Sequence, residues 1–176
     1  MKLGVLQFFS WPGRHGPLEE VYSRALERIE IMDKTGFDAV WLAEHHFTTF
    51  SVCPSVHMLG VLAAARTKRL RIGTAVSLAA LYHPLRLAEE VALLDVLSGG
   101  RVNWGAGRGF AHSEFNAFGV PVEESAARFR EAIRESQQRL TLLIEQSPLA
   151  VVEWNTAFEA RSWNSAAERI FGYQRN

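Results

Sequence analysis

Strand-like and helix-like segments alternate along the first 120 residues, and this alternation limits the folds that the chain can adopt. Short apolar segments of strand length cover residues 2–9, 37–43, 70–78 and 101–106, and segments with helical character cover residues 17–35, 54–66 and 84–97. Strand and helix in this order form βαβ units, whose right-handed crossovers make neighbouring strands parallel. The sequence therefore predicts an α/β fold. Because the strands are apolar on both faces, it also predicts a sheet that is covered on both sides.

The first helix has the clearest periodicity. Its apolar residues recur at intervals of three and four, which places them on one stripe of a helix with 3.6 residues per turn. Pro17 fits the first turn, and Gly36 fits the left-handed position at which many helices end. The stripe consists of Leu18, Val21, Tyr22, Ala25, Leu26, Ile29 and Met32.

Composition and length narrow the function classes. The chain of 176 residues has a formal net charge of zero, which argues against a nucleic-acid-binding protein. No apolar stretch reaches the roughly 18 residues of a membrane helix. The single cysteine, Cys53, has no partner for an internal disulfide, so we expect a cytoplasmic protein. A complete (β/α)8 barrel needs about 250 residues, so any match to that fold is partial.

The alternation stops in the last third of the chain. A long helical stretch covers residues 123–146, and its middle, residues 134–139, is wholly polar. Two short β-like segments follow at 149–154 and 158–163, and a small helix at 164–171 begins with Asn164 as a candidate N-cap. This change of pattern predicts a domain boundary near residue 136.

Polar residues follow the predicted strands, where parallel α/β proteins bind ligands. Glu44, His45 and His46 follow the second strand, and Arg108 lies within a glycine cluster after the fourth. This set can hold an anionic, aromatic cofactor and move a proton near neutral pH. Aromatic residues in the same loops could wall such a cofactor from water; they are Phe8, Phe9, Trp11, Phe47, Phe50 and Phe110.

Simpler interpretations compete with each of these. Adjacent histidines often satisfy backbone carbonyls, and glycines after a strand can serve only to allow a tight turn. Cys53 fits a small buried core residue better than a reactive thiol. The five residues Glu44, His45, His46, His83 and His112 lack the spacing of known metal motifs, so we expect no metal site.

Several ordered blocks of the sequence resemble the flavin-dependent, bacterial-luciferase-like monooxygenases. These blocks are the opening K-L-G at 2–4, G-F-D-A-V-W-L-A-E-H-H-F at 36–47, R-I-G-T-A-V at 71–76, H-P at 83–84, the stretch from L-D at 94–95 to S-G-G-R at 98–101, and G-R-G-F at 107–110. Separate blocks in the same order are more specific than any single motif. The resemblance covers about residues 1–134, which corresponds to four of the eight βα units of the family.

The resemblance implies a partial TIM-like (β/α)8 barrel and an oxidoreductase that uses reduced flavin and O2 to oxygenate a small organic substrate. The implied cofactor is FMN in its reduced form, FMNH2, supplied by a separate flavin reductase, whereas the deazaflavin F420 of some relatives fits the Glu-His-His block less well. His45 matches the catalytic base of the family, and Glu44 matches a family position near the flavin.

Further positions carry over to the flavin site. Ala75 and Val76 match a strand-end pair that supports the flavin ring, where the family often has a cis peptide. Arg108 matches a contact to the flavin phosphate, and Phe110 a neighbouring contact. Gly107 stands where luciferase carries a reactive cysteine, which weakens any inference of light emission.

Residues 137–176 resemble instead the beginning of a PAS sensor domain, an α+β fold of which less than half is present. The matching text runs from R-L at 139–140 to W at 154 and from W at 163 to Y at 173. The sequence thus predicts a half-barrel at residues 1–136 followed by an incomplete PAS-like segment at 137–176. Because the half-barrel sheet has two open edges, we expect self-association or a homo-oligomer.

Three functions follow from these observations. The first is a flavin-dependent monooxygenase, or a remnant of one, with His45 as the base. The second is a PAS-linked sensory or interaction module, in which the helix at 123–146 relays a signal. The third is an inactive truncated fragment.

Overall fold

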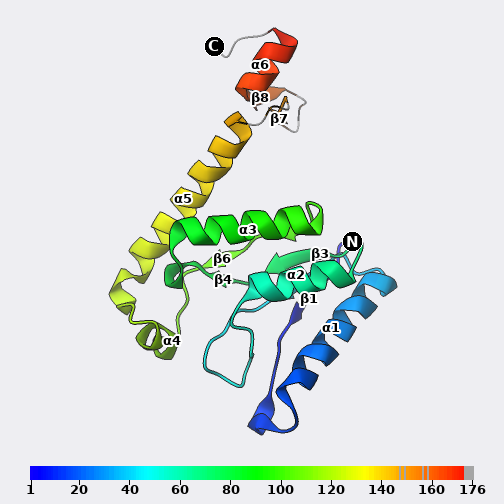
Figure 1. Cartoon of the computed structure of the whole chain (residues 1–176), viewed down its shortest axis with the longest axis vertical. Helices are drawn as coiled ribbons and strands as arrows, with labels where there is room; N and C mark the ends of the chain where they lie inside the picture. Colours follow the sequence, from blue (N-terminus) through cyan, green and yellow to red (C-terminus); the bar gives the residue numbers. More distant parts are fainter. Residues whose placement is uncertain (147, 149, 156, 158, 173–176) are drawn as a thin grey trace. The chain divides into compact units, whose positions relative to one another are not determined.

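The computed structural model describes residues 1–146, 148, 150–155, 157 and 159–172. The chain divides into two compact units, Met1–Ile133 and Arg134–Asn176, which we call the N-terminal unit and the C-terminal unit (Figure 1). Each unit is described by itself.

The N-terminal unit contains the alternating strands and helices that the sequence predicts. They are β1 (Gly4–Gln7), α1 (Leu18–Thr35), β2 (Ala39–Leu42), α2 (Val56–Arg66), β3 (Arg71–Thr74), β4 (Ser77–Leu78), α3 (Pro84–Ser98), β5 (Val102–Asn103), β6 (Ala106–Gly107) and α4 (His112–Ala117). Short 3-10 helices at Pro12–Arg14, Ala79–Leu81 and Val122–Glu124 link them. α1 ends at Gly36 in the left-handed conformation, and Ser55 caps α2 through its side chain.

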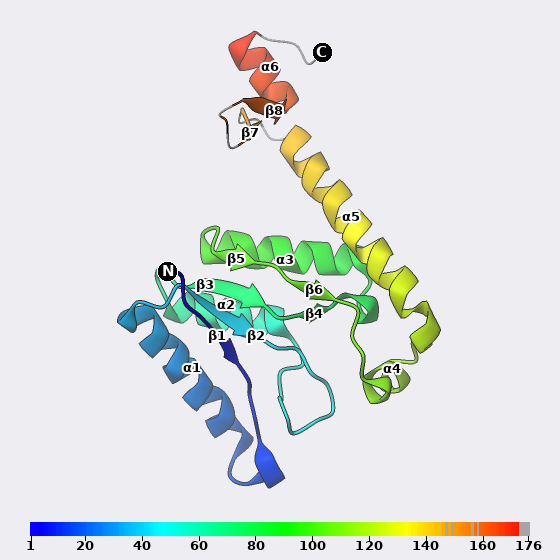
Figure 2. The same ribbon diagram turned by 180° about the vertical axis from the view of Figure 1, so that it is seen from behind.

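All strand pairs of this unit are parallel, which confirms the predicted α/β fold. Four strands form a sheet in the order β1-β2-β3-β5, and β4 pairs with β6 separately. α1, α2 and α3 lie on one face of the sheet (Figure 1), and Figure 2 shows the strands from the opposite side.

The expectation that both faces of the sheet are covered is wrong for this chain. Residues that face the helices, such as Val40 and Ile72, are fully buried, whereas Leu6 on the opposite face is 47% exposed. Trp41 lies beside Leu6 and Gly73 in the register, and its indole occupies the space that a side chain at residue 73 would need. The helix-facing side therefore carries the core, which is built from α1, α2 and β1–β3.

Two predicted strands are each broken into two short strands. Residues 70–78 form β3 and β4, and residues 101–106 form β5, with β6 beginning at Ala106. The break lies where the Thr74 hydroxyl contacts both the N–H and the carbonyl oxygen of Gly105, at 2.9 and 2.8 Å. At this point the Thr74 side chain, in place of a backbone ladder, makes the hydrogen bonds with the neighbouring strand segment. The peptide bond between Ala75 and Val76 is cis.

The predicted long helix is α5 (Ser125–Gln146), which begins after the 3-10 helix rather than at residue 123. In the C-terminal unit, β7 (Val152–Trp154) and β8 (Ala160–Trp163) pair antiparallel, and α6 (Ser165–Phe171) follows. Asn164 caps α6 as predicted, because its side chain accepts the N–H of Ala167 at 3.0 Å. The predicted strand ends at residues 149 and 158, and residue 173 of the PAS-like text, lie outside the described residues.

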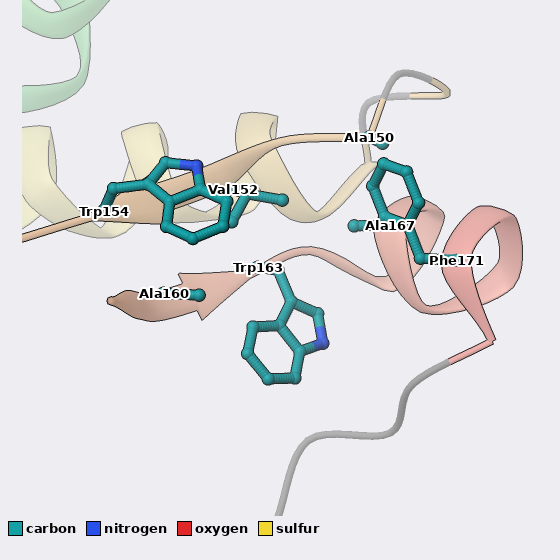
Figure 3. A pocket seen from close by; sticks show the side chains of 7 residues that line it. All are labelled: Ala150, Val152, Trp154, Ala160, Trp163, Ala167 and Phe171. Carbon is teal, nitrogen blue, oxygen red and sulfur yellow. The ribbon is translucent and has the colours of Figure 1, made fainter. Parts of the chain in front are cut away.

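An apolar pocket of about 700 Å³ lies in the C-terminal unit (Figure 3). Side chains from β7, β8 and α6 and the residue Ala150 line it; they are Ala150, Val152, Trp154, Ala160, Trp163, Ala167 and Phe171. Across the described part of the chain, no helix has both the length and the apolar character needed to cross a membrane.

Candidate flavin-binding edge of the parallel strands

The strands of the N-terminal unit bring the predicted site residues to the side of the sheet at which the parallel strands end, which we call the carboxyl edge. Because the pairs are parallel, the carboxyl ends of β2, β4 and β6 lie at the same edge, and the loops after them carry residues 43–46, 79–82 and 108–110. Ala75 N–H donates to the carbonyl oxygen of Leu42 at 2.7 Å, which ties the end of β2 to the start of the 75–78 segment. His45 and Arg108 therefore lie at the same edge, as the sequence predicts. The roles assigned to them stay predictions.

Glu44 is a buried carboxylate whose contacts are all within the protein. Its Oε1 accepts hydrogen bonds from the Tyr82 hydroxyl at 3.0 Å and lies 2.9 Å from His46 Nε2, and its Oε2 accepts the N–H of Leu78 at 3.2 Å. These contacts satisfy a charged group that has almost no exposure to water. Glu44 thus holds the loops after β2 and β4 together.

His45 lies beside a second buried carboxylate that the sequence analysis did not identify. The distance from His45 Nδ1 to Glu114 Oε1 is 3.5 Å, and the same oxygen accepts the backbone N–H of His46 at 2.8 Å. The His45 backbone N–H donates to the Cys53 carbonyl, and its ring packs edge-on against Phe50. Glu114 lies within α4 and not directly after a strand, so the rule used for the other residues does not identify it.

Ala75, Val76 and Gly107 come together at the β4–β6 pair. Leu78 is opposite Gly107 in the register, and a Cβ atom at residue 107 would overlap the side chain of Val76. A larger residue at 107, such as the cysteine of luciferase, would require Val76 to move. The backbones of these two segments are therefore in close contact, with a small apolar surface at the strand ends.

Arg108 and Phe110 are exposed at this edge. Arg108 makes no hydrogen bond or ion pair with any residue that the structure describes, and the Phe110 side chain is 80% exposed. Phe47, after β2, is 78% exposed and has a positive φ. An exposed guanidinium, exposed aromatic rings and an apolar strand end fit an anionic, aromatic group such as a flavin phosphate ester.

One predicted wall residue is in the wrong place. Phe9 is fully buried in the core, where it packs against Tyr22 of α1, because its side chain points to the helix-covered side. Phe8, which precedes Phe9 in the sequence, points to the opposite side and packs against Phe50 in the loop after β2. Alternation along the chain thus divides these two neighbours between core and loop.

Two ionisable groups near Glu44, Cys53 and Tyr82, stay neutral. Burial, and then the charge of Glu44, raise the pKa of the Cys53 thiol far above its ordinary value. Burial raises the pKa of Tyr82 as well, with further contributions from the charge and the hydrogen bond of Glu44. Cys53 is thus a buried core residue, as predicted, and Tyr82 is a permanent hydrogen-bond donor to Glu44.

A cavity of about 670 Å³ lies next to the contacts of Glu44, but none of the predicted site residues lines it. Its lining includes Tyr82, whose hydroxyl contacts Glu44, and Phe118, whose ring packs edge-on against His46. Among the described residues, no group of three or more His, Cys, Asp and Glu is arranged to hold a metal ion.

Comparison with protein families gives a match over most of the chain. A model of the luciferase-like monooxygenase family matches residues 1–163. The match extends beyond residue 136, where we expected the barrel-like part to end.

Individual proteins are similar over a shorter range. The alkanal monooxygenase alpha chain of Aliivibrio fischeri is 41% identical over 112 residues, which cover 62% of this chain and 32% of that protein. The oxygenase component of flavin-dependent trigonelline monooxygenase from Acinetobacter baylyi is 32% identical over 117 residues, covering 65% of this chain and 32% of that protein. The chain therefore spans about a third of the length of these curated relatives.

A solved structure extends the likeness to the fold. Monooxygenase RslO1 from Streptomyces bottropensis superimposes with a TM-score of 0.75 at 31% sequence identity. The superposition covers 94% of this chain and 48% of RslO1.

Proposed function

This chain belongs to the luciferase-like monooxygenase family, and we propose that it carries the flavin-binding part of an oxygenase active site. The observation that carries the proposal is the arrangement at the carboxyl edge of the strands. Arg108, whose guanidinium has no partner among the described residues, lies there with the Ala75–Val76 strand end and the His45–Glu114 pair.

The described residues suit reduced FMN. We assign Arg108 to the flavin phosphate. We assign the Ala75–Val76 backbone, Gly107 and Phe110 to the flavin ring system. Reduced FMN, when bound, supplies the electrons with which O2 is activated for insertion into a substrate. Glu44 supports the flavin site indirectly, by holding the surrounding loops, because its oxygens are occupied by His46, Tyr82 and Leu78. F420 is the alternative cofactor, and it shares the aromatic ring and phosphate that this edge would contact.

His45 is proposed as the base. When Nδ1–H of His45 points to the Glu114 carboxylate, Nε2 keeps a free lone pair and can accept a proton from the substrate. The carboxylate also stabilises the imidazolium that forms after proton transfer. Glu114 is thus a positioning residue for His45, and it is held in turn by the N–H of His46.

The proposed partners are O2, a small organic substrate such as an aldehyde, alkane or ketone, and a flavin reductase that supplies FMNH2.

Self-association is also proposed, because β1 and β5 are the two outer strands of the four-stranded sheet. Sedimentation at increasing protein concentration tests it. A sedimentation coefficient that rises with concentration is expected, and a constant monomer value would contradict the proposal.

A second candidate concerns residues 137–176, for which we keep the proposal of a PAS-like sensory segment. It is supported by the antiparallel pair β7–β8, the following helix α6 and the apolar pocket between them. The family match through residue 163 favours instead a continuation of the luciferase-like part. Deletion of residues 137–176 separates the two, since a sensory segment can be removed without loss of flavin binding.

The proposed function is tested by titrating the chain with FMN, with FMNH2 under anaerobic conditions and with riboflavin. We expect FMNH2 to bind with a dissociation constant below about 100 μM and riboflavin, which lacks the phosphate, to bind about tenfold more weakly. The variant Arg108→Gln should lose this preference for the phosphate. No binding of either FMN form at 100 μM would overturn the proposal.

A further inference from the structure

A buried polar network lies beneath the 75–78 segment, on the side of the helices. His57 of α2 is 4% exposed, and its two ring nitrogens contact different elements. Nε2 lies 3.0 Å from Ser77 Oγ on β4, and Nδ1 lies 3.1 Å from Glu90 Oε2 on α3. The Trp104 indole N–H donates to the same Ser77 oxygen at 3.2 Å. The Ser77 hydroxyl therefore joins α2 to the segment between β5 and β6, and His57 extends the network to α3.

The donors and acceptors fix the direction of these hydrogen bonds. An ionised carboxylate only accepts, so His57 carries its hydrogen on Nδ1 and donates it to Glu90. In that tautomer Nε2 is an acceptor, so the Ser77 hydroxyl donates to it while the Ser77 oxygen accepts the indole N–H of Trp104. Arg86, one turn earlier on α3, holds the other Glu90 oxygen at 2.9 Å. Every member has a partner, as a stable buried network requires.

The network adds a side-chain contact to a segment that is otherwise held by the β4–β6 pair and by the backbone hydrogen bond from Ala75 to Leu42. Ser77 is fully buried and adjoins the cis peptide bond, and its backbone N–H donates to the Gly105 carbonyl at 2.9 Å. On the other side, Leu78 N–H is held by Glu44. Residues 75–78 are thus held by His57 from the helix layer and by Glu44 from the loop after β2.

We propose that His57, anchored on Glu90, is a positioning residue that holds Ser77 and so sets the backbone of residues 75–78 on which the flavin ring rests. The inference depends on the proposed function only for its last step, the contact with flavin. His57 and Ser77 are buried, and His57 and Glu90 belong to the helices α2 and α3, so under the proposed function the flavin would not contact this network. The network is therefore an addition to the residues that the family resemblance identifies.

The test compares His57→Phe with His57→Gln in the full chain. Phenylalanine fills the space but offers no acceptor, whereas the glutamine amide oxygen can still accept from Ser77. We expect His57→Phe to speed hydrogen exchange of the Ser77 and Leu78 amides and to raise the dissociation constant for FMN, each about tenfold. His57→Gln should recover most of both losses.

Ser98→Ala serves as the matched control. Ser98 is buried, accepts the N–H of Arg101 and lies at the opposite edge of the sheet, before β5. Its variant should lower stability without changing exchange at residues 77 and 78 or the affinity for FMN.

The outcomes separate the two proposals. Exchange at Ser77 and Leu78 is measured without flavin, so unchanged exchange in a folded His57→Phe chain overturns the inference whether or not flavin binds. Faster exchange with an unchanged FMN affinity also overturns it. If the wild-type chain binds no flavin, the proposed function fails, and faster exchange in His57→Phe still shows that His57 positions the segment.

Discussion

Two buried carboxylates, Glu44 and Glu114, hold the loops at the carboxyl edge of the strands. Glu44 contacts His46 on its own loop, Leu78 of β4 and Tyr82 in the loop after β4, and Glu114 joins the loop after β2 to α4. Both are surrounded by donors, which is the condition under which a carboxylate is stable in an apolar interior. At the scale of single residues, the site is therefore set by acceptors that receive several hydrogen bonds.

Substitution of Glu114 should be costly. In Glu114→Ala the buried N–H of His46 loses its acceptor, so we expect the free energy of unfolding to fall by about 2–3 kcal/mol. Glu114→Gln keeps an acceptor oxygen and should lose about 1 kcal/mol. Urea unfolding measures both, with the exposed Glu123→Ala as control. Equal stability of Glu114→Ala and wild type would contradict the contact.

Cys53 should be unreactive in the folded chain. Burial excludes reagents from the thiol, and its raised pKa leaves almost no thiolate at neutral pH. We expect an aromatic disulfide reagent to react at least about a hundredfold more slowly in buffer than in denaturant. A Ser23→Cys chain provides an exposed thiol for comparison, since Ser23 lies on the outer face of α1. Equal rates for the two thiols in buffer would contradict the burial of Cys53.

At the scale of elements, Asp33 connects the end of α1 to the start of β3. Its carboxylate accepts the backbone N–H groups of Lys68, Arg69 and Leu70 at 3.1, 3.1 and 2.7 Å. Burial alone would raise the pKa of Asp33, but these donors and the Arg69 guanidinium outweigh burial and lower it. Because the folded-state pKa is depressed, the stabilisation is present above the ordinary aspartate pKa of about 4. It is lost as the pH falls through the lower, folded-state value.

The variant Asp33→Asn tests this contact. At pH 7 we expect a loss of about 1–2 kcal/mol in the free energy of unfolding, because the amide offers one acceptor in place of two. Between pH 7 and pH 3 the wild type should lose more stability than the variant. Urea unfolding at the two pH values measures the difference. An identical loss in both chains would show that Asp33 does not contribute to acid sensitivity.

The sequence predicts elements better than the contacts between them. The positions of α1, α2, α3 and α6 follow from apolar spacing and end residues, which are local signals. The break between β3 and β4 depends on Thr74 and Gly105, which are 31 residues apart. The contact of His46 with Glu114 joins residues 68 apart. No local sequence pattern identifies the Thr74–Gly105 contact or the His46–Glu114 contact, because both depend on the tertiary arrangement. The helix α4, which carries Glu114, is too short to show a helical period.

At the scale of the whole molecule, the chain separates the candidate site from the C-terminal unit. Every predicted site residue lies within Met1–Ile133, and Arg134–Asn176 has its own hairpin, helix and pocket. The site residues thus make their described contacts within one unit.

The variant Asn164→Ala tests this separation. Its side chain caps α6 and accepts the N–H of Val151, so its loss should destabilise the C-terminal unit by about 2 kcal/mol. Hydrogen exchange should quicken in α6 and β8 but not in β1–β3, and the affinity for FMN should stay within about twofold of wild type. A large loss of FMN affinity would mean that the C-terminal unit takes part in the site.

The most direct measurement is nuclear magnetic resonance mapping of the backbone amides during titration with FMN. If the carboxyl edge of the parallel strands holds the flavin, amides at residues 44–46, 75–78 and 107–110 should shift together, and Arg108→Gln should weaken that response. Amides at the opposite edge, at residues 67–70 and 98–101, should stay in place. Shifts confined to the opposite edge or to the C-terminal unit, or none at saturating FMN, would contradict the assignment of the flavin site.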